Sequence, residues 1–343
     1  MRIAVYGASG HQGKLIVAEL ARRGLQIVAV GRDRERLRAA AGDAEVRVAG
    51  LDDADRLAAA FRGCTVVINC AGPFTLSGSA VVRAALAAGC HYADTSGEQA
   101  QIKQTFDLFG AEAGRAGVTV VPAATDGGVP GDLIAHLLAD RLGPLEEIVT
   151  AHLIAGSGRL SRGSLRSLLE TAETLWSGGL GYEDGAWHPT AAARRTTMRF
   201  PGGSSEVPVV RFALQEVVTV PRHVDVRRVE GVADAALAAR FAIPIDPAAI
   251  ESLPEGPAAE SREAQEFTIV IDAVARDGRS ARGVVRGRDT YGTTARVAVE
   301  AASRLAADGA KPGVLAPSQA FDPAAFLDAL APYGLTWDLT VDG

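Results

Sequence analysis

Short apolar runs alternate with amphipathic or alanine-rich stretches over the first third of the chain. The apolar runs predict β-strands over Arg2–Tyr6, Gln26–Val30, Glu45–Ala49, Thr65–Cys70, His91–Ala93 and Val118–Pro122. The stretches between them predict helices over Gly13–Arg23, Arg34–Ala41, Asp53–Phe61, Gly78–Ala88 and Gln99–Ala116. Nearly continuous apolar strands joined by helices are typical of a parallel sheet that helices cover on both faces. With right-handed crossovers, this order predicts a doubly wound α/β domain.

The pattern changes after about residue 126. A strand over Thr150–Ala155 and a helix over Gly163–Trp176 precede a stretch that we expect to be a loop, from Ser177 to about Arg195. The later elements that we predict are a β-hairpin of Phe267–Arg276 and Arg282–Arg288, helices over Thr294–Ala307 and Asp322–Leu330, and an exposed loop over Pro254–Glu263. The hairpin is expected because Asp277-Gly278 separates the two runs. A chain of 343 residues with this change of pattern predicts about two domains.

Composition narrows the class of protein. Hydrophobic residues make up 48% of the chain, enough for a large buried core, and the formal net charge is −6. A mildly acidic chain without a block of Lys and Arg argues against a nucleic-acid partner. The chain begins with a strand and a turn rather than an apolar leader, and no run is long enough to span a membrane, so we expect a cytoplasmic protein.

A glycine motif follows the first strand. Its seven residues are Gly7, Ala8, Ser9, Gly10, His11, Gln12 and Gly13. Gly7 allows a sharp turn out of the strand, Gly10 allows backbone N–H groups to approach a pyrophosphate, and Gly13 allows the helix to lie close to the sheet. The N–H groups and the helix dipole then hold the phosphates. Because the motif lies at the first strand–turn–helix of an alternating chain, it predicts a Rossmann dinucleotide-binding domain.

The end of the second strand bears on the choice of cofactor. Arg32 occupies the tip, where an NAD-binding domain usually has an acidic residue, and Arg34 follows. A guanidinium can bind a 2′-phosphate and stack on adenine, which favours NADPH over NADH. The alternative is that Asp33 accepts hydrogen bonds from the ribose and both arginines are solvated.

Two further strand ends are candidates for cofactor contacts. Asp52, after the third strand, either accepts from the adenine amino group or caps the next helix. The residues after the fourth strand, where nicotinamide and ribose pass in this fold, are Ala71, Gly72, Pro73 and Phe74.

These motifs together resemble the saccharopine-dehydrogenase-like reductases. The residues that carry the resemblance are Gly7–Gly13, Gly31-Arg32, Asn69–Phe74, His91–Glu98, Asp126–Leu133 and Ser161–Leu165. The resemblance implies an α/β fold in which a Rossmann domain (1–126) precedes a mixed α/β substrate and dimerisation domain (127–310), and a C-terminal segment (311–343) returns to the first domain. It also implies reduction of a C=N bond, as in an imine reductase, or of a C=C bond.

Candidate catalytic groups gather at the carboxyl ends of the fifth and sixth strands. Tyr92 and Asp94 leave their strand on one face, and Asp126 lies at the same edge. Each of these could supply a proton to the substrate or bind a substrate amine, and the alternative for Asp94 is that it only caps the helix that follows. Glu98 and the residues that begin the helix of the second domain, Ser161, Arg162 and Ser164, are candidate substrate ligands, with helix capping as the alternative. No Tyr-x-x-x-Lys or clustered His/Cys pattern occurs, so we expect neither a Tyr–Lys dyad nor a metal.

The sequence therefore predicts an NADPH-dependent oxidoreductase that transfers a hydride to a small-molecule substrate. Two alternatives stay open at this point. One is an NAD(P)-dependent amino-acid dehydrogenase working in the oxidative direction, and the other is a non-catalytic NADP-sensing protein, since a Rossmann fold alone does not fix function. The β runs of the second domain offer a surface for a homodimer.

Overall fold

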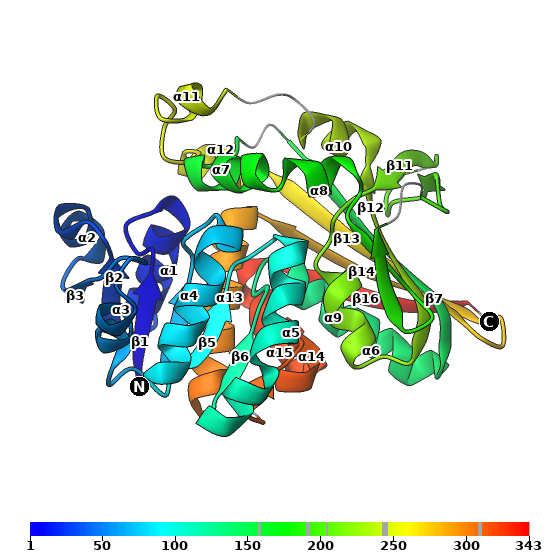
Figure 1. Ribbon diagram of the computed structural model, residues 1–343. Helices are drawn as coiled ribbons and strands as arrows, with labels where there is room; N and C mark the ends of the chain where they lie inside the picture. The colour runs from blue at the N-terminus through cyan, green and yellow to red at the C-terminus, as the bar shows by residue number, and fades with distance from the viewer. Residues whose placement is uncertain (157–158, 190–192, 204, 242–245, 308–310, 343) are drawn as a thin grey trace.

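Two β-sheets organise the molecule (Figure 1). The computed structural model describes residues 1–156, 159–189, 193–203, 205–241, 246–307 and 311–342. The strands of the first sheet are β1 (Arg2–Tyr6), β2 (Gln26–Gly31), β3 (Glu45–Val48), β4 (Val66–Asn69), β5 (His91–Asp94), β6 (Thr119–Val121) and β15 (Gly313–Val314). They run parallel in the order β15-β6-β5-β4-β1-β2-β3. This is the predicted doubly wound Rossmann arrangement.

Helices cover both faces of the first sheet. They are α1 (His11–Arg22), α2 (Arg34–Ala41), α3 (Ala54–Phe61), α4 (Phe74–Ala87), α5 (Gln99–Ala116) and α13 (Thr290–Ala307). Alternate residues of β1 belong to different cores: Ile3 and Val5 pack with α1 and α13, whereas Ala4 and Tyr6 pack with α3, α4 and α5. Both faces are therefore buried, which explains why the strands read as continuous apolar runs.

The second sheet is mixed and has nine strands. They are β7 (Leu145–Ala155), β8 (Leu180–Glu183), β9 (Ala186–Pro189), β10 (Thr197–Met198), β11 (Val207–Arg211), β12 (Val226–Asp234), β13 (Glu266–Ala275), β14 (Ser280–Arg288) and β16 (Thr336–Asp342). The main path is β10-β11-β12-β7-β13-β14-β16, and β8 pairs with β12 and β9. Helix α6 (Gly128–Leu142) packs on β13 and β14.

The remaining helices are short. They are α7 (Arg162–Glu170), α8 (Ala172–Trp176), α9 (Glu216–Thr219), η1 (Val220–Arg222), α10 (Ala235–Phe241), α11 (Pro247–Ile250), α12 (Ala259–Glu263), α14 (Pro317–Ala320), α15 (Pro323–Leu330) and η2 (Ala331–Tyr333). Figure 1 shows α7, α11 and α12 lying across the end of the Rossmann domain where its strands finish. Among the described residues, no helix is long and apolar enough to cross a bilayer.

Two of the predicted loops were wrong in part. The stretch from Ser177 contains the hairpin β8–β9, whose turn is Asp184-Gly185, with positive φ at both residues, and whose Tyr182 and Trp187 rings lie 5.1 Å apart. Residues 190–192 of that stretch lie outside the described residues. The stretch from Pro254 contains α12, a single turn.

The start of α4 was also wrong. The helix begins at Phe74 instead of Gly78, because the Glu98 carboxylate accepts hydrogen bonds from the backbone N–H groups of Phe74 and Thr75. That carboxylate satisfies donors that a helix start otherwise leaves free, and it comes from the loop after β5.

The segments after residue 289 cross between the two sheets. Helix α13, which follows the β13–β14 hairpin, packs on the Rossmann sheet rather than within the second domain. The C-terminal segment is divided: β15 pairs with β6, whereas β16, contrary to the expected packing on the first domain, pairs with β14. Residues 308–310, at the expected boundary, lie outside the described residues.

Candidate functional site

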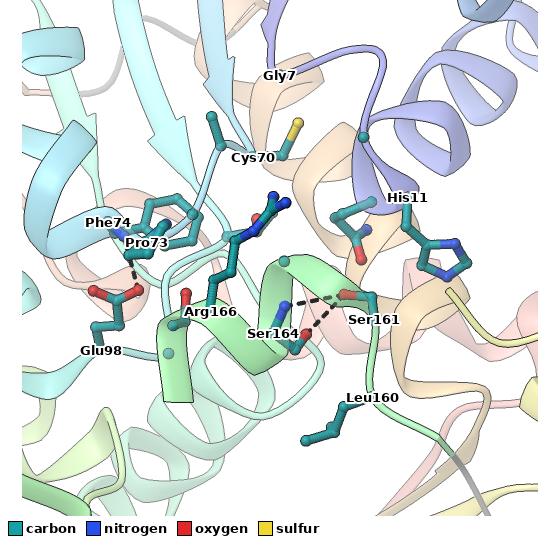
Figure 2. A pocket seen from close by; sticks show the side chains of 18 of the residues that line it. Gly7, His11, Cys70, Pro73, Phe74, Glu98, Leu160, Ser161, Ser164 and Arg166 are labelled. Carbon is teal, nitrogen blue, oxygen red and sulfur yellow. Dashed lines mark hydrogen bonds between the residues drawn. The ribbon is translucent and has the colours of Figure 1, made fainter. Parts of the chain in front are cut away.

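A cleft of about 1300 Å³ lies between the carboxyl edge of the Rossmann sheet and the second domain. One wall consists of the loops after β1, β2, β3, β4, β5 and β6. The other wall includes α7, α8, the loop before α9 and the loop between α11 and α12, and residues of β7, α10 and the start of α13 also line the cleft. Figure 2 shows this cleft, with Arg166 projecting from α7 toward Cys70. The switch point of a doubly wound sheet is where ligands bind in this fold.

The glycine loop has the geometry that its motif predicts. Gly7 has φ +85°, and its N–H donates to the carbonyl oxygen of Val30 at 2.9 Å. A Cβ atom at Gly7 would lie 2.9 Å from Cβ of Ala71, and one at Gly13 would lie 2.2 Å from the carbonyl oxygen of Gly7. Gly10 caps α1 without a side-chain hydrogen bond. The first N–H groups of α1 are thus open to the cleft, where they fit a pyrophosphate.

The rest of the loop also belongs to the cleft. The residues of the motif that line it are Gly7, Ser9, Gly10, His11 and Gln12. Gln12 donates from Nε2 to the carbonyl oxygen of Tyr291 at 3.1 Å, and the His11 ring stands edge-on to the Tyr291 ring at 4.9 Å. These two contacts attach the loop to the start of α13.

The residues after β2 divide into two kinds. Arg32 lines the cleft and has no ion-pair partner among the described residues. Asp33 accepts from the N–H groups of Glu35 and Arg36 at 3.0 Å, so it caps α2 and does not line the cleft. Arg34 lies away from the cleft, whereas Arg36, which the sequence analysis did not select, lines it. The guanidinium groups after β2 that line the cleft are therefore those of Arg32 and of Arg36, which pairs with Glu255 at 2.8 Å.

The candidates after β3 and β4 also line the cleft. Asp52 faces it, and the neighbouring Asp53 caps α3 by accepting from the N–H of Arg56 at 2.9 Å. The capping role that was an alternative for Asp52 thus belongs to Asp53. The lining residues after β4 are Ala71, Gly72, Pro73 and Phe74.

Tyr92 and Asp94 lie beneath the cleft and do not line it. Both are 0% exposed, and Tyr92 Oη donates to Asp94 Oδ2 at 3.0 Å. Asp94 Oδ1 also accepts from the N–H groups of Ser96 and Ala123, both at 3.0 Å. Burial raises the pKa of Asp94 to about 6. The network joins the ends of β5 and β6, and neither side chain is among the residues that line the cleft.

Asp126 is the one predicted acid of these three that lines the cleft. Its Oδ1 accepts from Oγ1 of Thr294 at 2.9 Å, and its N–H donates to the same hydroxyl at 3.1 Å. Burial raises the pKa of Asp126 to about 6. His152, which the sequence shows only as an isolated histidine, lines the cleft as well, and its Nε2 lies 2.6 Å from Oε1 of Glu216.

The predicted substrate ligands are largely engaged within the protein. Ser161 caps α7 by accepting from the N–H of Ser164 at 3.1 Å (Figure 2). The Tyr291 hydroxyl accepts from the N–H of Ser161 at 2.8 Å and lies 2.8 Å from Oγ of Ser164. The backbone N–H of Arg162 donates to the carbonyl oxygen of Glu255 at 3.0 Å. Glu98 lines the cleft but holds the start of α4, as described above.

A parallel doubly wound sheet, an uncapped glycine loop at its first helix and a second domain over its carboxyl edge define a two-domain protein of the Rossmann dinucleotide-binding class. Residues 3–121 match the family model of the saccharopine dehydrogenase NADP binding domain. This match covers the Rossmann domain and agrees with the resemblance that its motifs carry.

Curated proteins are similar to parts of this chain. A trans-acting enoyl reductase of Mycobacterium tuberculosis is 32% identical over 148 residues, which are 40% of this chain and 35% of that protein. Another protein of that organism is 32% identical over 185 residues, 50% of this chain and 44% of its own length. The chain therefore spans less than half the length of these curated relatives.

The whole fold has a solved counterpart. The saccharopine dehydrogenase (L-Glu forming) of Saccharomyces cerevisiae matches 100% of both chains with a TM-score of 0.64 and 14% sequence identity. The likeness extends the shared fold beyond the Rossmann domain to the second sheet.

Proposed function

We propose that this protein is an NADPH-dependent reductase that transfers a hydride to a polarised C=C or C=N bond of a small metabolite. The observation that carries the proposal is the cleft itself, in which an open glycine loop faces a substrate wall supplied by a second domain. The NADP-binding family of residues 3–121 and the name of the enoyl reductase relative support it.

The cofactor preference rests on two arginines. Arg32 and Arg36 line the cleft beside the glycine loop, whereas Asp33, the first carboxylate after β2, caps α2 and does not line the cleft. NADPH would be held by the N–H groups at the start of α1, by these guanidinium groups on its 2′-phosphate, and by Asp52 at the adenine. When bound, it supplies the hydride.

Part of the substrate wall is apolar. The side chains that supply this character are Ile154, Leu168, Leu175, Phe212, Leu214 and Phe241. The Phe212 and Phe241 rings lie 5.5 Å apart in an edge-on arrangement. Such a wall suits a substrate with an apolar portion, because burying it removes apolar surface from water. Arg166, which projects from the same wall, forms an ion pair with Glu251, so a polar group of the substrate would have to share or replace that contact.

Cofactor binding tests the first half of the proposal. Arg32→Glu should weaken NADPH binding by roughly 30-fold or more and leave NADH within about threefold, because it replaces a charge-assisted contact with repulsion. Nicotinamide fluorescence during titration measures both affinities. Arg34→Glu is the matched control, because this substitution makes the same change of charge two residues from Arg32, at a position outside the cleft. Equal losses for both nucleotides would contradict the preference.

Turnover tests the second half. NADPH oxidation is followed with 2-cyclohexen-1-one, trans-2-octenal and 2-methyl-1-pyrroline, and NADP reduction with a panel of amino acids. Oxidation with the enones or the imine supports a reductase, and NADP reduction by an amino acid would assign the oxidative direction. Binding of NADPH without turnover of any compound would favour a sensor and overturn the proposal.

A further inference from the structure

His152 occupies an unusual place on the floor of the cleft. It lies on β7, the strand that opens the second domain, and 15% of its side chain is exposed. The strands on either side place uncharged residues in register with it, Ala233 of β12 and Ile269 of β13. The charged groups that act on its ring are the carboxylates of Glu216 and Asp126.

Glu216 holds the His152 ring. It is 0% exposed, and its Oε1 lies 2.6 Å from His152 Nε2 and accepts from Oγ1 of Thr150 at 3.3 Å. A carboxylate buried this fully is costly unless it is paired, so its position is fixed by the histidine. With Nε2 engaged, Nδ1 is the ring nitrogen that has no hydrogen-bond partner among the described residues.

Gly127, in the loop before α6, and Gly131 of α6 leave room for His152 and Glu216. A Cβ atom at Gly127 would lie 2.6 Å from Cε1 of His152. A Cβ atom at Gly131 would lie 2.3 Å from Oε1 of Glu216. Distances below 3.0 Å are not tolerated between real side chains without movement. The glycines that follow Asp126 in the sequence therefore make the space in which a histidine and a glutamate lie at the cleft floor.

We propose that His152, oriented by Glu216, is the group that donates the proton completing the reduction. The inference rests on the proposed function. His152 gives its Nδ1 proton to the substrate atom next to the carbon that receives the hydride. The substrate gains one hydride and one proton, the nicotinamide is oxidised, and the neutral imidazole regains a proton from water. Glu216 is a positioning residue, because it acts on the substrate only through His152.

The charge of the pair suits this role. Burial alone would lower the pKa of His152, but the Glu216 carboxylate, with a contribution from Asp126, raises it above its usual value. A histidine with a raised pKa stays protonated toward neutral pH and loses its proton as the pH rises through that value. The reduction rate should therefore be level at low pH and fall on the alkaline side.

Kinetics of three variants test the proposal on the fastest of the enone and imine probes named above. His152→Gln should lower kcat by roughly 100-fold or more, the usual worth of a general acid. It should leave NADPH affinity within about threefold, since the glycine loop and Arg32 are untouched. Glu216→Gln should shift the alkaline fall of kcat to lower pH. The matched control is His223→Gln, because His223 is also buried and paired with a carboxylate, its Nε2 lying 2.9 Å from Oδ2 of Asp132, but it lies outside the cleft.

Each outcome decides the question. A large loss of kcat in His152→Gln with full NADPH binding, together with the pH shift in Glu216→Gln, supports the proposal. It is overturned if His152→Gln keeps its rate, if Glu216→Gln slows the reaction without moving the pH profile, or if Asp126→Asn alone abolishes turnover.

Side-chain NMR of the histidines gives a readout that needs no substrate. The signal absent from His152→Gln should titrate above the usual histidine value in the wild type and lower in Glu216→Gln. No such difference would also overturn the proposal. A wild-type protein that binds NADPH but reduces none of the probes would instead contradict the proposed function, and the inference would fail with it.

Discussion

Gly13 of α1 and Gly110 of α5 differ in how much space surrounds them, and a Cβ atom added at each position shows the difference. A Cβ atom at Gly13 would lie 2.2 Å from the carbonyl oxygen of Gly7 and 2.7 Å from Cα of Ala8, and both of these are backbone atoms. At Gly110, in the middle of α5, nothing lies within 4 Å of such an atom. The two positions have the same helical conformation, so they differ in their surroundings and not in their intrinsic preference for helix.

The pair yields a stability prediction. Gly13→Ala should lower the free energy of unfolding by about 1–3 kcal/mol, the usual cost of overpacking, and weaken NADPH binding because the loop must move. Gly110→Ala should raise the free energy of unfolding by about 0.5–1 kcal/mol, because alanine restricts the unfolded chain and fits the helix. Urea unfolding measures both changes. Equal effects of the two substitutions would show that helix α1 does not depend on close approach to the glycine loop.

At the scale of single residues, the sequence predicts the positions where the backbone conformation requires glycine. It misses side chains whose role depends on a partner far away in the sequence. Gly7, Gly10 and Gly13 could be found because each has a local conformational reason. His152 could not, because its partner Glu216 is 64 residues away in the sequence and only the packing of helix α9 in the folded second domain brings them together. Tyr92 and Asp94 were selected from their alternation on β5, which correctly gives a shared face but does not show whether that face opens to the cleft or to the core.

At the scale of elements, the loop between α11 and α12 lies over the glycine loop. The Glu255 carboxylate forms ion pairs with Lys14 of α1 and, at 2.8 Å, with Arg36 of α2. A Cβ atom at Gly256 would lie 2.1 Å from Nδ1 of His11, so the backbone rests on that ring. The sequence shows only a Pro- and Glu-rich stretch here, because the charges that hold it come from another domain.

A carboxylate between two cationic side chains competes with a phosphate for them. Glu255→Gln should therefore tighten NADPH binding by roughly three- to tenfold, since each partly exposed ion pair is worth only about 0.2–1 kcal/mol. NADH, which lacks the 2′-phosphate, should bind unchanged. Titration of both nucleotides at low salt measures the ratio. Glu260→Gln on α12, an exposed carboxylate without an ion pair among the described residues, is the control for a change of net charge. Weaker NADPH binding in Glu255→Gln would mean that Glu255 instead helps to hold the cofactor.

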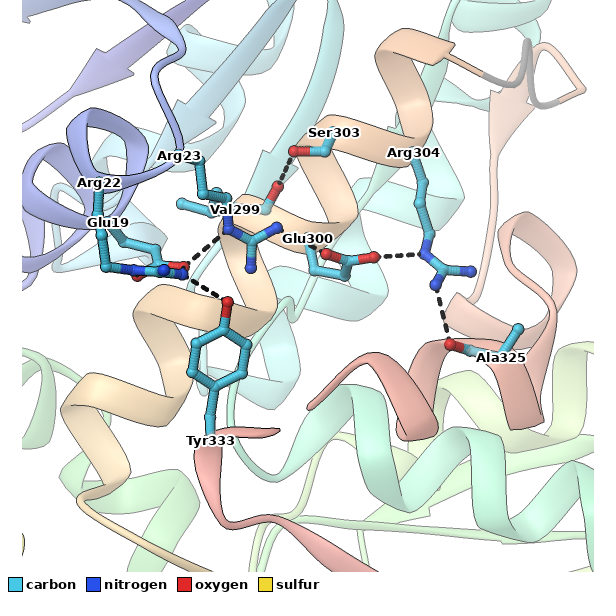
Figure 3. Close-up of polar contacts among 9 residues, drawn as sticks. All are labelled: Glu19, Arg22, Arg23, Val299, Glu300, Ser303, Arg304, Ala325 and Tyr333. Carbon is cyan, nitrogen blue, oxygen red and sulfur yellow. Dashed lines mark hydrogen bonds and ion pairs between the residues drawn. The ribbon is translucent and has the colours of Figure 1, made fainter. Parts of the chain in front are cut away.

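At the scale of the whole molecule, the chain crosses between its two sheets more than once. Helix α13 follows β14 of the second sheet and packs on the Rossmann sheet, and β16 returns to pair with β14. Figure 3 shows polar contacts that join α1, α13 and α15: Arg23, at the C-terminal end of α1, bonds to Glu19 and to Glu300 of α13, and Arg304 bonds to Glu300 and to the carbonyl oxygen of Ala325 in α15.

The sequence predicts the alternating first domain more fully than this interleaving. Local periodicity identifies strands and helices, and parallel crossovers restrict how they assemble. Strands such as β12 and β16 pair with partners far along the chain. Helix α6 begins with glycines and a proline, residues of low helix propensity, so its first turn is not recognised as helical from the sequence. Which sheet the last strand joins is decided by packing, which leaves no local pattern in the sequence.

Interleaving has a consequence for unfolding. Separate domains joined by a linker unfold in separate transitions, whereas here the loss of the second sheet would also release α13 and the apolar side chains that it covers on the Rossmann sheet. We therefore expect one calorimetric transition, with calorimetric and van't Hoff enthalpies that agree. NADPH at 100 times its dissociation constant should add about 2.7 kcal/mol and move that transition to higher temperature as a whole. Two transitions, of which NADPH shifts only one, would show that the Rossmann domain and the second sheet are energetically independent.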